Sequence, residues 1–216
     1  MINRDYSKRI TLILLFAVAM GYFEAAVVVY LRELFYPFGF TFPLREMPHN
    51  LIVIEIFREL STLVMLLTVA GIAGKRFWER FGYFVVMFGV WDIFYYVWLW
   101  ATIRWPMSLL DWDILFLIPI PWIGPVIAPV LVSILMIITG LAITGLYARG
   151  YTFRPDLWTW LAAIVATGLI LYTFMRDTGA ALKQQTPEPY SYGLFVLGLL
   201  LYMGAFLWAY HRTPGA

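Results

Sequence analysis

The chain has 216 residues, of which 62% are hydrophobic and only 13% carry a charge. Soluble domains typically carry about 25% charged residues, so this chain cannot cover a water-facing surface, and lipid must cover much of it. The net charge of +2 excludes a strongly basic nucleic-acid surface, and the lack of cysteine excludes disulfides and thiolate metal sites. The two histidines, His49 and His211, fall near expected helix ends, so no covalent or bis-histidine haem is expected.

Six apolar runs come close to the length of about 20 residues that a helix needs to cross a bilayer. They are Ile10–Leu31, Leu51–Ala73, Phe81–Ile103, Ile123–Leu146, Leu157–Met175 and Tyr192–Tyr210. Because the connections are short, sequential neighbours should pack as antiparallel pairs within one membrane domain, residues 1–216. The sequence therefore predicts an all-α, polytopic transmembrane bundle of about six spans.

The basic residues of the loops and termini predict the orientation of the bundle. If the N-terminus is cytoplasmic, one set of basic residues lies on that side: Arg4, Lys8, Arg9, Lys75, Arg76, Arg80, Arg149, Arg154 and Arg212. The opposite side then receives a smaller set: Arg45, Arg104, Arg176 and Lys183. Cytoplasmic loops carry the excess of basic residues, which places both termini in the cytoplasm of a bacterial-type inner membrane.

The connection between the third and fourth spans is apolar and rich in proline. Its run Ile114–Ile120 is too short to cross a bilayer, and several prolines prevent a regular helix there: Pro119, Pro121, Pro125 and Pro129. Such backbone is tolerated at membrane depth only where protein or water satisfies it, so we expect a segment that dips into or lies along the outer interface. Asp111 and Asp113 within it are a candidate metal-binding pair at the outer surface.

Charged residues lie inside the first three spans, where each costs about 2.5–3.5 kcal/mol at the bilayer centre. They are Glu24 in the first span, Glu55, Arg58 and Glu59 in the second, and Asp92 in the third. At about 1.5 Å per residue, the antiparallel spans place these carboxylates at similar heights, in the centre or outer half of the membrane. The heights predict one cluster.

Helical spacing predicts which side chains face that cluster. Glu55, Arg58 and Glu59 share one face of the second span, and Asp92, Tyr95 and Tyr96 share one face of the third. The carboxylates outnumber the arginines, so they must take up protons, bind a cation or contact water. We expect the cluster to be the site of any chemistry in this chain.

Three classes of function remain open. The favoured one is proton or cation handling, by a membrane subunit of a respiratory or transport assembly with other membrane or periplasmic subunits as partners and a quinone-like molecule as candidate ligand. The second is an enzyme acting on a lipid-phase substrate with a divalent cation, because oxygen ligands suit Mg²⁺, Ca²⁺ and Mn²⁺. The third is a scaffold subunit whose charges only fix helix packing.

Overall fold

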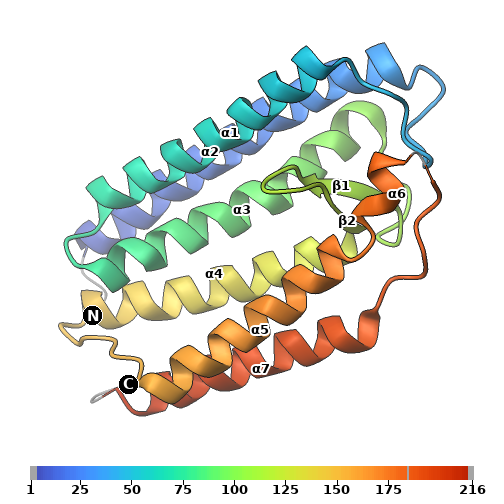
Figure 1. Ribbon diagram of the computed structural model, residues 1–216. Coiled ribbons are helices and arrows are strands. Elements are labelled where there is room, and N and C mark those ends of the chain that lie inside the picture. The colour runs from blue at the N-terminus through green and yellow to red at the C-terminus, as the bar shows by residue number, and fades with distance from the viewer. Residues whose placement is uncertain (1–3, 184, 214–216) are drawn as a thin grey trace.

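The computed structural model describes residues 4–183 and 185–213, and this part of the chain is mostly helical (Figure 1). The helices are α1 (Arg4–Phe35), α2 (His49–Ala73), α3 (Phe77–Ile103), α4 (Ile127–Ala148), α5 (Leu157–Met175), α6 (Thr178–Leu182) and α7 (Tyr192–His211). The strands are β1 (Trp112–Phe116) and β2 (Trp122–Pro125). Where the helices match predicted spans, most boundaries differ from the prediction by only a few residues.

Five helices of the described chain are long and apolar enough to cross a membrane: α1, α3, α4, α5 continued into α6, and α7. This identifies a multi-pass membrane protein. The helix α2 has 25 residues but is not among these five, and its first half carries Glu55, Arg58 and Glu59. The sixth span therefore stays a prediction.

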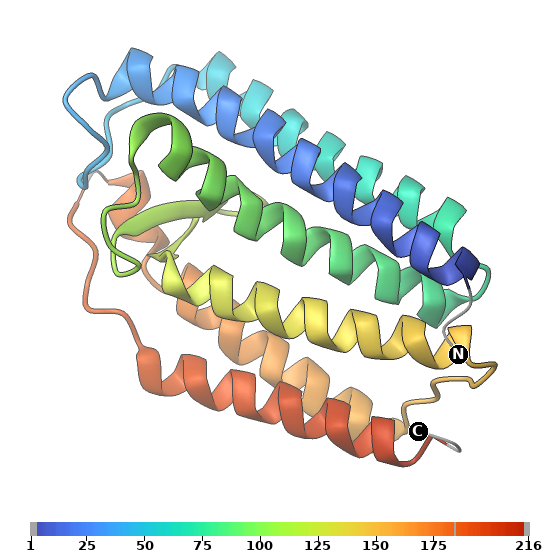
Figure 2. The ribbon, with the colours of Figure 1, turned by 180° about the vertical axis from the view of Figure 1, so that it is seen from behind.

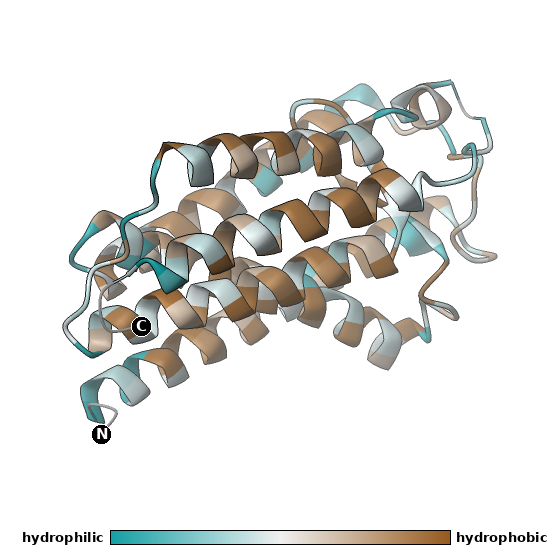
Figure 3. Ribbon diagram, turned by 90° about the horizontal axis from the view of Figure 1, so that it is seen from below, coloured by the Kyte–Doolittle hydropathy of each residue, from teal (hydrophilic) through white to brown (hydrophobic). Residues whose placement is uncertain are grey.

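The helices lie side by side with α3 near the middle of the bundle. One side of α3 packs against α1 and the other against α4, while α5 pairs with α7 (Figures 1 and 2). The helix α1 begins and α7 ends at one end of the bundle, called here the terminal end; the two strands lie toward the opposite end, the hairpin end. Hydrophobic residues dominate the long helices between these ends (Figure 3).

Small residues allow α3 and α4 to approach closely. A Cβ atom added at Gly140 would lie 2.6 Å from the carbonyl oxygen of Gly82, and one at Gly89 would lie 2.5 Å from that of Ser133. Thr144, one turn after Gly140, is fully buried. The small-residue spacing Gly140-x-x-x-Thr144 thus belongs to helix packing, as such spacings commonly do in membranes.

The proline-rich segment contains two strands, and its predicted place at the outer interface stays a prediction. Its strands β1 and β2 form an antiparallel hairpin that pairs Trp112 with Pro125 and Ile114 with Ile123. The prediction that the fourth span begins at Ile123 is wrong, because Ile123 is extended and paired with β1, so that α4 begins only at Ile127. Hydrogen bonds between the two strands satisfy many of the backbone N–H and C=O groups that a non-helical segment would otherwise leave unpaired beside membrane helices.

Candidate functional site

A cavity of about 760 Å³ lies toward the hairpin end, among α1, α2, α3 and the hairpin. Its lining includes every residue of the predicted cluster: Glu24, Glu55, Arg58, Glu59, Asp92, Tyr95 and Tyr96. The segment between α1 and α2 contributes the exposed lining residues Arg45 and Glu46, and His49 at the start of α2 is also exposed, so the cavity reaches the surface there. We call it the hairpin cavity.

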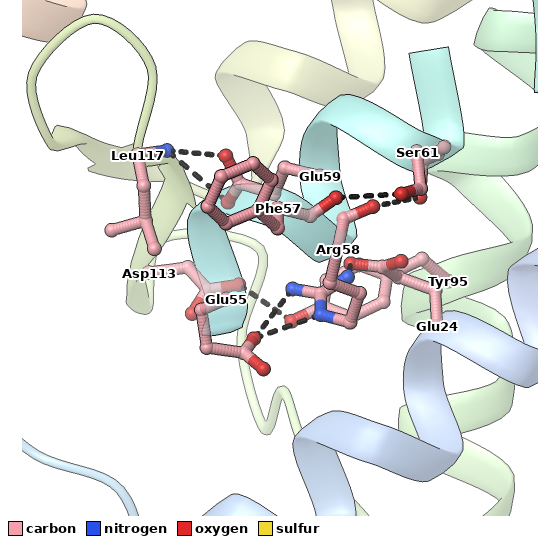
Figure 4. Close-up of polar contacts among 10 residues, drawn as sticks. Glu24, Glu55, Phe57, Arg58, Glu59, Ser61, Tyr95, Asp113 and Leu117 are labelled. Atoms are coloured by element: carbon pink, nitrogen blue, oxygen red, sulfur yellow. Dashed lines mark hydrogen bonds and ion pairs between the residues drawn. The ribbon is translucent and has the colours of Figure 1, made fainter. Parts of the chain in front are cut away.

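Arg58 joins α1 to α2 through two carboxylates (Figure 4). Its Nε and Nη2 donate to Oε2 of Glu55 at 2.8 Å and 2.7 Å, within one helical turn of α2. Its Nη1 donates to Oε1 of Glu24, which projects from α1. The sequence spacing predicted the first contact, and the matching heights of α1 and α2 account for the second.

Glu59 holds the hairpin rather than an arginine. Its two carboxylate oxygens accept hydrogen bonds from the backbone N–H of Leu117, at 2.9 Å and 3.2 Å (Figure 4). Leu117 directly follows β1, where the chain turns toward β2. Within the described residues, no cationic side chain lies within ion-pair distance of Glu59, although the Glu59 side chain is buried.

Asp92 also lacks an ion pair within the described part of the chain. The Oγ of Ser133 on α4 donates to its Oδ2 at 2.8 Å, and this is the contact that holds the carboxylate. Asp92 is partly buried on α3 and faces the hairpin cavity. Within the described residues, Glu59 and Asp92 thus have hydrogen-bond donors but no ion pair.

A second buried ion pair, which the sequence did not predict, joins α1 to the hairpin. Nη2 of Arg32 donates to Oδ1 of Asp113 at 3.0 Å, and the guanidinium lies 3.6 Å from the ring centre of Trp105 and 4.4 Å from that of Phe40. The hydroxyl of Tyr95 donates weakly to the other oxygen of Asp113, at 3.4 Å. Burial raises the pKa of the Asp113 carboxyl above its ordinary value, and Arg32 opposes that rise.

The two aspartates of the hairpin segment do not form a surface pair. Asp113 is 2% exposed and faces Arg32 inside the bundle. Asp111 instead accepts hydrogen bonds from the backbone N–H groups of Met107 and Ser108, at 2.8 Å and 3.0 Å, and closes a turn. Nowhere in the described chain do three or more histidine, aspartate or glutamate side chains form a group that could hold a metal ion.

Three polar contacts at the site lie outside the predicted cluster: Arg32 with Asp113, the backbone N–H of Leu117 with Glu59, and Ser133 with Asp92. Asp113 was predicted to lie in the outer, proline-rich segment, and Arg32 lies near the end of α1. Their contact depends on the hairpin folding back into the bundle, which no spacing rule predicts.

No known protein family, curated protein or solved structure matches this chain. The fold and the site together define a multi-pass membrane protein with a polar cavity, rich in buried charge, at one end of its helical bundle.

Proposed function

We propose that the protein handles protons through Glu59 and Asp92, as a subunit of a respiratory or transport assembly in a bacterial-type inner membrane. The observation that carries the proposal is the pairing pattern around the hairpin cavity. Arginines neutralise Glu24, Glu55 and Asp113, whereas within the described residues Glu59 and Asp92 have only hydrogen-bond donors.

An ionised carboxylate without a counter-charge is unfavourable inside a protein, so such a group takes up a proton, binds a cation or contacts water. Within the described residues, no group of three metal-binding side chains supports a coordinated divalent ion. Protons are therefore the better-supported occupants, and the metal-dependent enzyme loses its main structural support. Intramembrane carboxylates that connect to one face of a membrane are typical of proton relays.

The half of the bundle toward the terminal end supports proton exchange with one side of the membrane only. Between α1, α2 and α3 it contains fully buried apolar side chains, among them Ala17, Leu66 and Val86. With the termini in the cytoplasm, as the basic residues favour, the hairpin cavity faces the outer side. Protons would exchange with the outer solution, and transfer across the whole membrane would need another subunit.

The experiment is an infrared titration of the purified protein in lipid nanodiscs, which follows the C=O absorption of protonated carboxyl groups. Glu59→Gln and Asp92→Asn each keep one acceptor oxygen, for Leu117 and for Ser133, so both variants should fold while each loses part of that absorption. Glu33→Gln, at an exposed residue of α1, is the matched control and should leave the cavity component intact. A titration that Glu59→Gln and Asp92→Asn leave unchanged contradicts the proposal.

The scaffold alternative predicts a different pattern. If Glu59 and Asp92 only fix helix packing, their neutral variants should unfold more easily, and no titrating absorption should disappear from folded protein. Glu24→Gln is a useful comparison, because Glu24 has an ion-pair partner and its loss should lower stability under either hypothesis.

A further inference from the structure

Two polar groups on residues that line the hairpin cavity have no hydrogen-bond partner among the described residues. The indole Nε1 of Trp91 and the Nη1 of Arg32 are buried without an acceptor, and these side chains are 6% and 7% exposed. Both residues line the cavity. Buried polar groups are nearly always hydrogen-bonded, so an unpaired donor in a cavity wall calls for an explanation.

Both unpaired groups are donors, and this constrains the chemistry of a ligand. Tryptophan and arginine side chains donate hydrogen bonds and cannot accept them. Glu59 and Asp92, when protonated, add further hydroxyl donors to the same wall. A ligand that pairs with these two groups must therefore offer acceptor atoms, such as carbonyl oxygens, which an ammonium group or a metal ion does not.

The remaining walls suit a flat, apolar body. Aromatic rings of Trp91, Tyr95, Tyr96 and Phe116 line the cavity together with Val28 and Leu31 of α1. The volume of about 760 Å³ falls within the range of about 300–1,000 Å³ that small-molecule and cofactor sites occupy. From Glu24 to Arg32 the lining follows α1 for eight residues, or about 12 Å, which leaves room for a ring and the start of a tail.

We infer that the hairpin cavity binds a quinone, with Trp91 as a hydrogen-bond donor to one of its carbonyl oxygens. A quinone combines carbonyl acceptors, a flat ring and an apolar tail, and its oxygens exchange protons when the ring changes redox state. This inference rests on the proposed function, because Glu59 and Asp92 would be the carboxyl groups beside the ring. It adds the class of ligand.

The structure provides a matched pair of variants for testing the donor. Trp122 also has a buried Nε1 without a partner in the described part of the chain, but Trp122 does not line the hairpin cavity. Trp91→Phe and Trp122→Phe therefore make the same chemical change, one inside the cavity wall and one outside it. Both variants replace the larger indole, with its N–H, by a phenyl ring, so an aromatic ring stays in place.

The experiment is isothermal titration of the full chain in nanodiscs with decylubiquinone and, separately, with menadione. We expect saturable binding to the wild type, weakened about three- to tenfold by Trp91→Phe, as the loss of one hydrogen bond predicts, and changed less than about twofold by Trp122→Phe. Extraction of native preparations should yield quinone with wild type and less with Trp91→Phe. Absence of saturable binding, equal effects of the two variants, or extracts with phospholipid alone would overturn the inference.

The two proposals can fail separately. Carboxyl titration in the infrared without quinone binding would leave proton handling standing and remove the quinone. Quinone binding with no titration at Glu59 or Asp92 would remove the proposed function and, with it, the assignment of these carboxyl groups as neighbours of the ring.

Discussion

Arg58 is predicted to be the residue on which the attachment of α2 to α1 depends. Replacing it with methionine leaves the carboxylates of Glu24 and Glu55 buried without a counter-charge, since their side chains are only 11% and 9% exposed. Removing one partner of a buried ion pair costs about 3–5 kcal/mol, most of it from the charge left behind. We therefore expect Arg58→Met to lower the free energy of unfolding by that amount.

The triple variant Glu24→Gln, Glu55→Gln, Arg58→Met serves as its control. It removes all three charges together, so at least half of the stability lost in Arg58→Met should return, because replacing a whole buried ion-pair group is often close to neutral. Both variants can be measured by titrating the protein in mixed micelles with dodecyl sulfate and following circular dichroism. A loss below about 1 kcal/mol in Arg58→Met would refute the reasoning, because that is the range of exposed ion pairs.

Two further predictions concern helix packing and helix ends. Gly140→Ala should destabilise the protein by about 1–3 kcal/mol, because its Cβ would lie 2.6 Å from the Gly82 carbonyl oxygen, whereas Gly145→Ala, with its nearest atom at 3.9 Å, should cost nothing in the same unfolding assay. Asp156 accepts hydrogen bonds at the start of α5 and pairs with Arg212 beyond α7, which together lower its pKa from 3.8 to about 2. A carboxyl group whose pKa is lower in the folded state stabilises the fold at pH values above its unfolded-state pKa, and this stabilisation is lost as the pH falls through its folded-state pKa. Asp156→Asn should therefore lower the unfolding midpoint fully above pH 3.8, and the difference from wild type should disappear near pH 2. A deficit that is independent of pH would show that the charge of Asp156 does not matter.

The parts of the fold that follow from periodicity could be predicted from the sequence. Long apolar runs indicated the long helices, and the three- and four-residue spacing of Glu55, Arg58 and Glu59 indicated their shared face. The rise of antiparallel helices predicted Asp92 at the same height, and Asp92 lines the same cavity as these residues. These predictions depend on local geometry that every helix obeys.

The hairpin could not be predicted in the same way. Its strands are only five and four residues long, and its prolines indicated the absence of a helix without indicating strands. The depth of Asp113 depends on Arg32, which is 81 residues away in sequence, and on a backbone contact between Leu117 and Glu59. Such contacts arise from tertiary folding, and a single sequence has no periodic signal for them.

The absence of cysteine allows one experiment to test whether the hairpin cavity faces the outer solution. Leu31 lines the cavity, so a cysteine there should react with a charged, membrane-impermeant thiol reagent in right-side-out vesicles and not in inverted ones. A cysteine at Leu66, which is fully buried, should react in neither, and one at Arg149, an exposed residue at the C-terminal end of α4, should react only in inverted vesicles. Reaction at residue 31 only in inverted vesicles, or in neither preparation, would contradict a cavity from which Glu59 and Asp92 exchange protons with the outer side.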